Sequence, residues 1–174
     1  MFASIYLPNF YLQAAMRHQR ELRAKPVALI EEQDKKPVII QLNEPAEKAG
    51  IRKGMTPSQA LARSLEVVIK VRTRRQEKSI QEMLLHFAFT LSPFVEATAP
   101  GVCTIQFTDN RDLAAKVSRI IEHLAECEIS AQAGIAPTPD ASVLAAHLAR
   151  TVLEIDNARE FLAPLPIETL AMSV

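Results

Sequence analysis

The densest group of residues able to do chemistry in this chain is basic. It lies between residues 70 and 78 and contains Lys70, Arg72, Arg74, Arg75 and Lys78. Lys and Arg side chains bind phosphate oxygens, and they supply the sequence-independent part of DNA binding. We therefore predict that Lys70, Arg72, Arg74 and Arg75 contact DNA. A solvated link between two parts of the fold, with no ligand, is the alternative.

Residue types that ligate metals are present, but their spacing predicts no metal site. Cys103 and Cys127 are too far apart for a metal-knuckle pair, and the four histidines share no ligand spacing. Glu31, Glu32 and Asp34 lie at an expected hairpin tip, which is a poor cage for a cation. We interpret the cysteines as reduced, mostly buried thiols and the histidines as surface or packing residues.

Composition limits the class of protein. A chain of 174 residues with 48% hydrophobic and 23% charged residues forms one or two small domains around a real core. It has 20 Lys+Arg and 20 Asp+Glu, and this balance counts against tight DNA binding by this segment alone. With no run of roughly 18 apolar residues and no signal-peptide pattern, we expect a cytoplasmic location and no membrane partner.

Periodicity predicts alternating strands and helices. Between residues 102 and 107, Val102, Thr104 and Gln106 fall on one face of a strand and the residues between them on the other. Further strands are expected at 2–7, 27–31, 37–42, 65–71, 129–136 and 152–155. Helices are expected at 10–18, 43–49, 56–63, 76–91, from 109 or 110 to about 124, and at 138–151, with a helical turn at 157–162. The outer segments form an antiparallel sheet backed by two helices, so the expected fold is α+β and ferredoxin-like.

Six stretches, taken in order, resemble the motifs of Y-family (lesion-bypass) DNA polymerases. They are the opening segment 2–11, ELRAKPVA at 21–28, NEPAEKAGIRKGM at 43–55, SPFVE at 92–96, AGIAPTPDASVLA at 133–145 and the segment 162–170. The resemblance implies a ferredoxin-like polymerase palm with a small inserted fingers subdomain, and no thumb or little finger. The implied domains are palm at 1–19 and 74–163, fingers at 20–73, and the start of the connector to the thumb at 164–174.

The residues that match the family's metal ligands are not acidic. In the family, three carboxylates hold the divalent ions of nucleotidyl transfer, and Mg²⁺ prefers oxygen ligands. The matching positions here are Tyr6, Gly101 and Val102. The resemblance therefore implies no metal ligand and no catalytic residue, and we expect no Mg²⁺ or other cofactor at the palm.

The family's triphosphate contacts are also replaced. Its tyrosine and arginine match Glu44 and Glu47, and its later lysine matches Val143. Two acids would repel a triphosphate, so no substrate contact is expected at these positions. Tyr11 retains the family's steric-gate position, although packing between palm and fingers is an equally simple role.

This pattern resembles the catalytically silent, ImuB-type branch of the family, found in bacterial mutagenesis cassettes. The resemblance implies a non-enzymatic adaptor of error-prone translesion synthesis, DNA repair and the SOS response. Its implied partners are DNA, an error-prone polymerase, an accessory mutagenesis protein and the sliding clamp. Two alternatives stay open. One is an active template-directed polymerase whose metal ligands come from elsewhere, such as Glu96 or Asp109. The other is a regulatory module with no DNA role.

Overall fold

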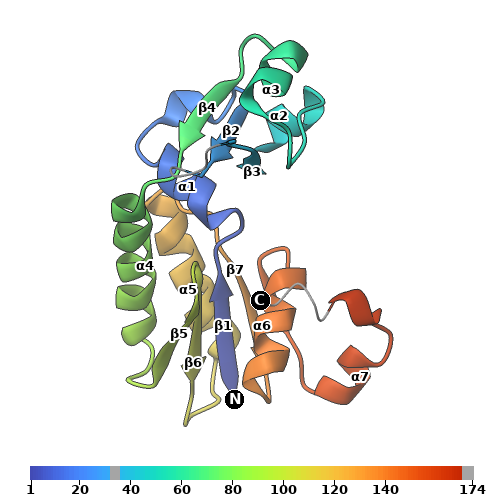
Figure 1. Ribbon diagram of the computed structural model, residues 1–174. Helices are drawn as coiled ribbons and strands as arrows, with labels where there is room; N and C mark the ends of the chain where they lie inside the picture. The colour runs from blue at the N-terminus through green and yellow to red at the C-terminus, as the bar shows by residue number, and fades with distance from the viewer. Residues whose placement is uncertain (32–35, 170–174) are drawn as a thin grey trace. The chain divides into compact units, whose positions relative to one another are not determined.

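The computed structural model describes residues 1–31 and 36–169, which belong to two compact units (Figure 1). The outer unit contains Met1–Pro8 and the described residues from Gln81 onward. The inserted unit is Asn9–Ile80. The chain therefore completes one strand of the outer unit, builds the whole inserted unit, and then returns.

The outer unit is built on a five-stranded sheet with the order β5-β6-β1-β7-β8. Its elements are β1 (Phe2–Tyr6), the part of α4 (Arg74–Phe89) from Gln81 onward, β5 (Val95–Ala99), β6 (Val102–Gln106), α5 (Leu113–Glu126), β7 (Gln132–Ala136), α6 (Pro139–Leu148), β8 (Val152–Glu154) and α7 (Ala158–Leu162). β1 is antiparallel to both β6 and β7, whereas β8 is parallel to β7. The order of the first four strands and their two helices confirms the predicted ferredoxin-like arrangement.

The two faces of this sheet differ in chemistry. Ala3 and Ile5 of β1 point to one face, where they and their neighbours on β6 and β7 are fully buried. Ser4 points to the other face, because side chains alternate along a strand. There its hydroxyl bonds that of Ser142 on α6, 2.7 Å away. Figure 1 shows α6 on one side of the sheet and α4 and α5 on the other. One face is therefore purely apolar, and the α6 face carries hydroxyl groups.

Gly134 sets how closely α6 packs on the sheet. A Cβ at this position would lie 2.3 Å from both the Ala146 nitrogen and the Ser142 oxygen, which are backbone atoms of α6. Backbone atoms of a packed helix cannot move aside as a flexible side chain can. A residue with no side chain is therefore required here for α6 to lie against β7.

The inserted unit has its own three-stranded sheet with the order β3-β2-β4. Its elements are α1 (Phe10–Met16), the short 3₁₀ helix η1 (Arg20–Leu22), β2 (Val27–Ile30), β3 (Ile39–Leu42), α2 (Glu44–Lys48), α3 (Pro57–Arg63), β4 (Val68–Val71) and the first turns of α4. β2 is antiparallel to β3, as the predicted hairpin requires, and parallel to β4. Two apolar clusters hold the unit, one on each side of β2.

The helix starts in the inserted unit follow their sequence signals. The Asn43 side chain accepts from the Ala46 nitrogen at the start of α2, and Thr56 and Gln59 form a reciprocal capping box at the start of α3. Gly50 follows α2 with a φ of 80°, a left-handed value that glycine adopts at little cost. Such caps are worth roughly 1 kcal/mol each, so they define these short helices.

Several element boundaries differ from the sequence prediction. α4 begins at Arg74 instead of residue 76, because the polar residues that open it carry no apolar periodicity. α1 groups with the inserted unit and not with the outer one, because Leu12 and Ala15 pack in one cluster with Leu22 and the strand β2. The inserted unit therefore extends beyond the predicted 20–73 on both sides. Residues 170–174 of the predicted connector, with Glu32 and Asp34, lie outside the described residues.

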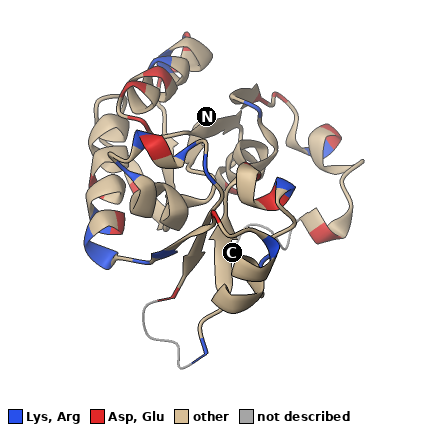
Figure 2. Ribbon diagram, turned by 90° about the horizontal axis from the view of Figure 1, so that it is seen from above, with Lys and Arg blue, Asp and Glu red and all other residues tan. Residues whose placement is uncertain are grey.

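Charge is spread over the molecule. Figure 2 shows Lys and Arg interspersed with Asp and Glu along the helices, with basic residues where β4 leads into α4. Among the described residues, every helix is too short or too polar to cross a membrane.

Candidate functional site

Tyr6, Gly101 and Val102 lie together at one end of the outer sheet. They match the family's three metal-binding carboxylates and are named the three acid positions. The antiparallel register of β1 and β6 places Tyr6 opposite Val102. The Leu7 nitrogen donates to the Gly101 oxygen over 2.8 Å, which continues the pairing by one residue. Residues about a hundred positions apart in the chain are thus neighbours, as the family resemblance implied.

Gly101 forms the turn between β5 and β6. Its φ is 74°, in the left-handed region where a side chain costs roughly 1–2 kcal/mol. Its nitrogen donates to Oε1 of Gln81, 2.8 Å away. Both backbone groups of Gly101 are therefore engaged, and the position serves the turn geometry.

Tyr6 packs against α6. Its ring stacks on the imidazole of His147, with the ring centroids 4.0 Å apart and the planes 21° from parallel. Nδ1 of His147 lies 2.9 Å from the Val143 carbonyl oxygen. Since a carbonyl oxygen only accepts, Nδ1 is the donor in this hydrogen bond. Partial burial raises the pKa of the Tyr6 phenol, so the hydroxyl stays protonated at neutral pH.

A chain of four hydroxyl groups lies beside Tyr6 on the same face of the sheet. Ser4 Oγ is 2.9 Å from Thr104 Oγ1 and 2.7 Å from Ser142 Oγ, and Thr104 Oγ1 is 2.7 Å from Thr98 Oγ1. Ser142 Oγ also donates to the Pro139 oxygen over 2.7 Å. Each buried hydroxyl has a protein partner, so these four hydroxyl groups form a satisfied polar network within an apolar core. The polar residues at alternate positions of β1 and β6 were the sequence signal for it, and sequence reasoning missed it.

The donor set at this end of the sheet does not fit a divalent cation. The family's ions require carboxylate oxygens, and the three acid positions supply a protonated phenol, a turn glycine and a valine. The hydroxyl groups nearby are bonded to one another. Over residues 1–31 and 36–169 we find no cluster of three or more Asp, Glu, His or Cys side chains with a metal-binding arrangement.

Glu96 and Asp109, the two alternative metal ligands, lie at different places in the outer unit. Glu96 on β5 pairs with Thr104 of β6 and so lies on the α6 side of the sheet, near the sheet edge and exposed. Asp109 is also exposed, and both of its carboxylate oxygens accept from Nε of Arg111 at 3.2 Å. The hydrogen bonds from Arg111 lower the pKa of Asp109.

In the inserted unit, the acids that replace the phosphate contacts are accompanied by cations. Glu44 is paired with Lys48 at 2.6 Å, and the hydrogen bond from Lys48 lowers the pKa of the exposed Glu44 carboxyl. Glu47 lines a hollow of about 490 Å³ together with Leu42, Arg52 and Lys53. Sequence reasoning missed the two cations beside Glu47, although they stand within the same motif. The expected repulsion of a phosphate is therefore offset locally by Lys48, Arg52 and Lys53.

Arg72, predicted to bind DNA, is occupied within the inserted unit. Its Nε and Nη2 donate to the two carboxylate oxygens of Glu77 at 2.6 and 3.0 Å, and its Nη1 donates to Glu31 at 3.0 Å. The guanidinium carbon also lies 3.7 Å from the centre of the Tyr11 ring. The hydrogen bond to Glu77 is the main cause of a raised pKa for Arg72. This cluster gives both Arg72 and the steric-gate position Tyr11 a structural partner that the sequence did not indicate.

The remaining predicted DNA contacts are exposed or half-exposed. Lys70 lies on β4 and is half-exposed, while Arg74 and Arg75 open α4 and are exposed. They are close in sequence to Arg72, whose own ion pairs are with Glu31 and Glu77. The four predicted DNA contacts therefore separate into one internal residue and three surface cations.

Known structures share this fold. The chain is similar to Dbh DNA polymerase in a post-insertion binary complex, with a TM-score of 0.84 and 16% identity over 97% of this chain and 52% of that one. It is also similar to DinB from Sulfolobus solfataricus, with a TM-score of 0.80 and 14% identity over 97% of this chain and 52% of that one. These matches confirm the palm-and-fingers fold.

Curated relatives carry polymerase names. Proteins named DNA polymerase IV from Shewanella pealeana and Pectobacterium atrosepticum are 26% and 25% identical, over 91% and 92% of this chain. The chain spans about half the length of these relatives, 47% and 48%. These names contradict the expectation that the chain is not an enzyme, and that expectation is corrected here. That expectation rested on six substituted positions, three for metal ligands and three for triphosphate contacts, whereas the relatives match along nearly the whole chain.

A family comparison covers most of both units. Residues 5–147 match the impB/mucB/samB family, a region that begins within β1 and ends within α6. It includes the inserted unit and four of the five outer strands. The chain therefore belongs to the impB/mucB/samB family of Y-family DNA polymerase domains.

Proposed function

We propose that this chain is the palm-and-fingers portion of a protein that acts as an adaptor in error-prone translesion synthesis and DNA repair. The observation that carries the proposal is the contrast at one end of the outer sheet. The β1–β6 frame of the family is kept, while Tyr6, Gly101 and Val102 replace its acids and pack or turn instead. A palm that keeps its fold but lacks the family's ion ligands suits a protein that brings other molecules together. We propose that the adaptor acts in the cytoplasm, and that it takes part in the DNA damage response and in mutagenesis.

The proposed partners are DNA, an error-prone polymerase, an accessory mutagenesis protein and the sliding clamp. DNA contact is supported by the similarity of this chain to Dbh DNA polymerase in an insertion ternary complex. Lys70, Arg74 and Arg75 supply the proposed contacts, and each phosphate contact steepens the salt dependence of binding. Changing the three to Ala should weaken binding to a fluorescent primer-template and reduce the salt slope by up to about three. Arg150→Ala and Arg159→Ala, exposed changes in the outer unit, are the matched controls.

The adaptor role is tested by binding to the purified partners. Sedimentation or calorimetry with the clamp, the error-prone polymerase and the accessory protein, each alone and then together, should give at least one saturable complex. Simultaneous binding of two partners is the expected result for an adaptor. Failure to bind any of them, by this chain and by the full-length protein, would reject the role.

A second candidate is template-directed nucleotidyl transfer, favoured by the names of the curated relatives. Primer extension in Mg²⁺ or Mn²⁺ tests it, with Glu96→Gln and Asp109→Asn probing the alternative ligands. Template-dependent incorporation that disappears in Glu96→Gln would assign the chemistry to a displaced ligand set. We also propose that Mg²⁺ does not bind at the three acid positions. Calorimetric titration should give Mg²⁺ binding only after Tyr6→Asp and Val102→Glu are introduced together, and tight binding by the unaltered chain would reject this.

A further inference from the structure

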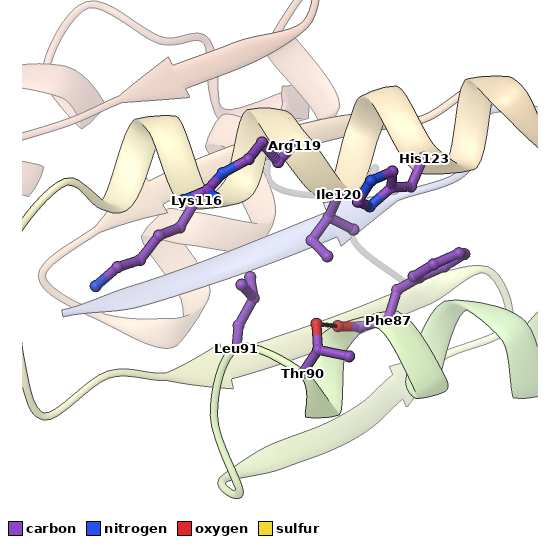
Figure 3. A pocket seen from close by; sticks show the side chains of 7 residues that line it. All are labelled: Phe87, Thr90, Leu91, Lys116, Arg119, Ile120 and His123. Carbon is purple, nitrogen blue, oxygen red and sulfur yellow. Dashed lines mark hydrogen bonds between the residues drawn. The ribbon is translucent and has the colours of Figure 1, made fainter.

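A groove between two helices of the outer unit has no role in the functions proposed above. It has a volume of about 420 Å³ and lies between the end of α4 and the middle of α5. Its lining residues are Phe87, Thr90, Leu91, Lys116, Arg119, Ile120 and His123. Figure 3 shows Leu91 and Ile120 pointing toward one another across it, with the rings of Phe87 and His123 together at one end.

The floor of the groove is apolar. Ile120 is 3% exposed, and the rings of Phe87 and His123 stack with their centroids 5.8 Å apart. The hydroxyl of Thr90 donates to the Phe87 oxygen over 2.6 Å, so it offers no free donor (Figure 3). Phe87 and Leu91 are only half-buried, so an occupant with apolar side chains would remove their remaining apolar surface from water.

The rim of the groove is basic. Lys116, Arg119 and His123 follow one another along α5 with spacings of three and four residues, which places them on one side of the helix. Lys116 and Arg119 form a cationic row, and the rise along the helix axis between them is roughly 4.5 Å. Asp109 forms its ion pair with Arg111, and Lys116 acts on it only through a weaker electrostatic interaction. In the described part of the chain, neither Lys116 nor Arg119 forms an ion pair. This cationic row stands out in a chain with as many acids as bases.

We propose that this groove docks an acidic amphipathic helix of a partner protein. Two apolar side chains of that helix would cover Phe87 and Leu91, which lie over the buried Ile120, and carboxylates along its edge would meet the cationic row. A helix laid into a groove between two helices is a recurrent mode of peptide recognition. Carboxylates one turn apart on such a helix are spaced to reach successive cations of the row.

The apolar floor favours a peptide over nucleic acid. Phosphates need only the cations and would leave the half-buried Phe87 and Leu91 in contact with water. The inference is independent of catalysis and of DNA binding, because it uses no residue assigned to either.

The probe is a fluorescein-labelled synthetic helix with Leu and Phe along one stripe and Glu along the edge of that stripe. Titrated with the whole chain, it should show saturable binding that weakens as salt is raised. Nuclear magnetic resonance shifts should centre on residues 87–91 and 116–123. Lys116→Glu with Arg119→Glu should weaken binding about tenfold or more, because each attraction becomes a repulsion.

Charge exchange supplies the matched control. A peptide with Lys in place of each Glu should bind the Lys116→Glu, Arg119→Glu variant better than the unaltered chain. Arg150→Glu with Arg159→Glu, exposed positions of the same unit, should change neither affinity, and far-UV circular dichroism checks that all variants fold. The proposal is overturned if the reversed variant binds the Glu peptide as well as the unaltered chain does. It is overturned equally if the shifts map elsewhere, or if single-stranded DNA occupies the groove and the Glu peptide does not.

Discussion

Arg72 is the residue whose replacement best tests the structural reasoning. The sequence placed it among four DNA contacts, whereas the fold surrounds it with Glu77, Glu31 and the Tyr11 ring. The side chains of Arg72 and Glu77 are 25% and 11% exposed. We predict that Arg72→Ala destabilises the inserted unit before it has any direct effect on DNA.

The magnitude follows from what the substitution leaves behind. Removing one partner of a buried ion pair costs about 3–5 kcal/mol, because the other charge stays buried and unpaired. A quarter of the Arg72 side chain is exposed, and screening by water reduces this to about 2–3 kcal/mol. The loss of the guanidinium from the Tyr11 ring adds about 0.5–1 kcal/mol. Arg72→Lys, which keeps the charge but not the paired hydrogen bonds to Glu77, should cost about 1–2 kcal/mol.

The assay is urea unfolding followed by far-UV circular dichroism and by tyrosine fluorescence. The chain has two tyrosines and no tryptophan, so the fluorescence reports Tyr6 and Tyr11 alone. Arg75→Ala, an exposed change three residues away, should alter the free energy of unfolding by less than about 0.5 kcal/mol. A double-mutant cycle with Glu77→Gln isolates the coupling between the two side chains. The reasoning is refuted if Arg72→Ala costs no more than Arg75→Ala, or costs the same with Glu77→Gln present as without it.

Three further outcomes are expected. Gly134→Ala should lower the free energy of unfolding by about 3 kcal/mol or more, since its Cβ would meet α6 backbone atoms at 2.3 Å; a loss under about 1 kcal/mol in thermal unfolding would show that α6 can shift. Burial raises the pKa of the Cys103 thiol from 9.0 to about 12, so the folded state holds this proton longer than the unfolded state. Stability should therefore fall as the pH rises from 9 toward 12, by up to about 1.4 kcal/mol per pH unit, and Cys103→Ala should remove that component from urea titrations at each pH. Ser142→Ala should cost about 1–2 kcal/mol by leaving the Ser4 hydroxyl short of a partner, and adding Ser4→Ala should then cost little; strictly additive losses would contradict a shared network.

The sequence alone determined most of the local structure, because its signals act over a few residues. Alternation predicted which side chains of β6 share a face, and the register with β1 confirms it. Thr56 before Pro57 predicted the start of α3, where a full capping box forms. The same kind of signal was incomplete at α5, which begins at Leu113 with no side-chain cap from Asp112. There the apolar face, and not the cap, defines the helix.

The family motifs predicted the fold, but the prediction from them that the chain is not an enzyme was wrong. Ordered landmarks such as Gly50 and Gly134 carry geometric requirements, a left-handed φ in one case and close helix packing in the other. Such requirements persist in any chain that keeps the fold. The identities of six residues, three for metal ligands and three for phosphate contacts, do not by themselves decide activity. The polymerase names of the relatives contradict the inference drawn from them.

Only the tertiary structure decided which side chains meet. Ser4 bonds Thr104 and Ser142, which are 100 and 138 residues away, and His147 comes to lie on Tyr6. Arg72 forms an ion pair with Glu31, which is 41 residues away in the sequence. Its position in a basic run therefore did not predict its role. Periodicity tells which face of an element a residue occupies, but the partner on that face depends on strand order and helix packing. Those are set by burial summed over the whole core, and no short stretch of sequence contains that information.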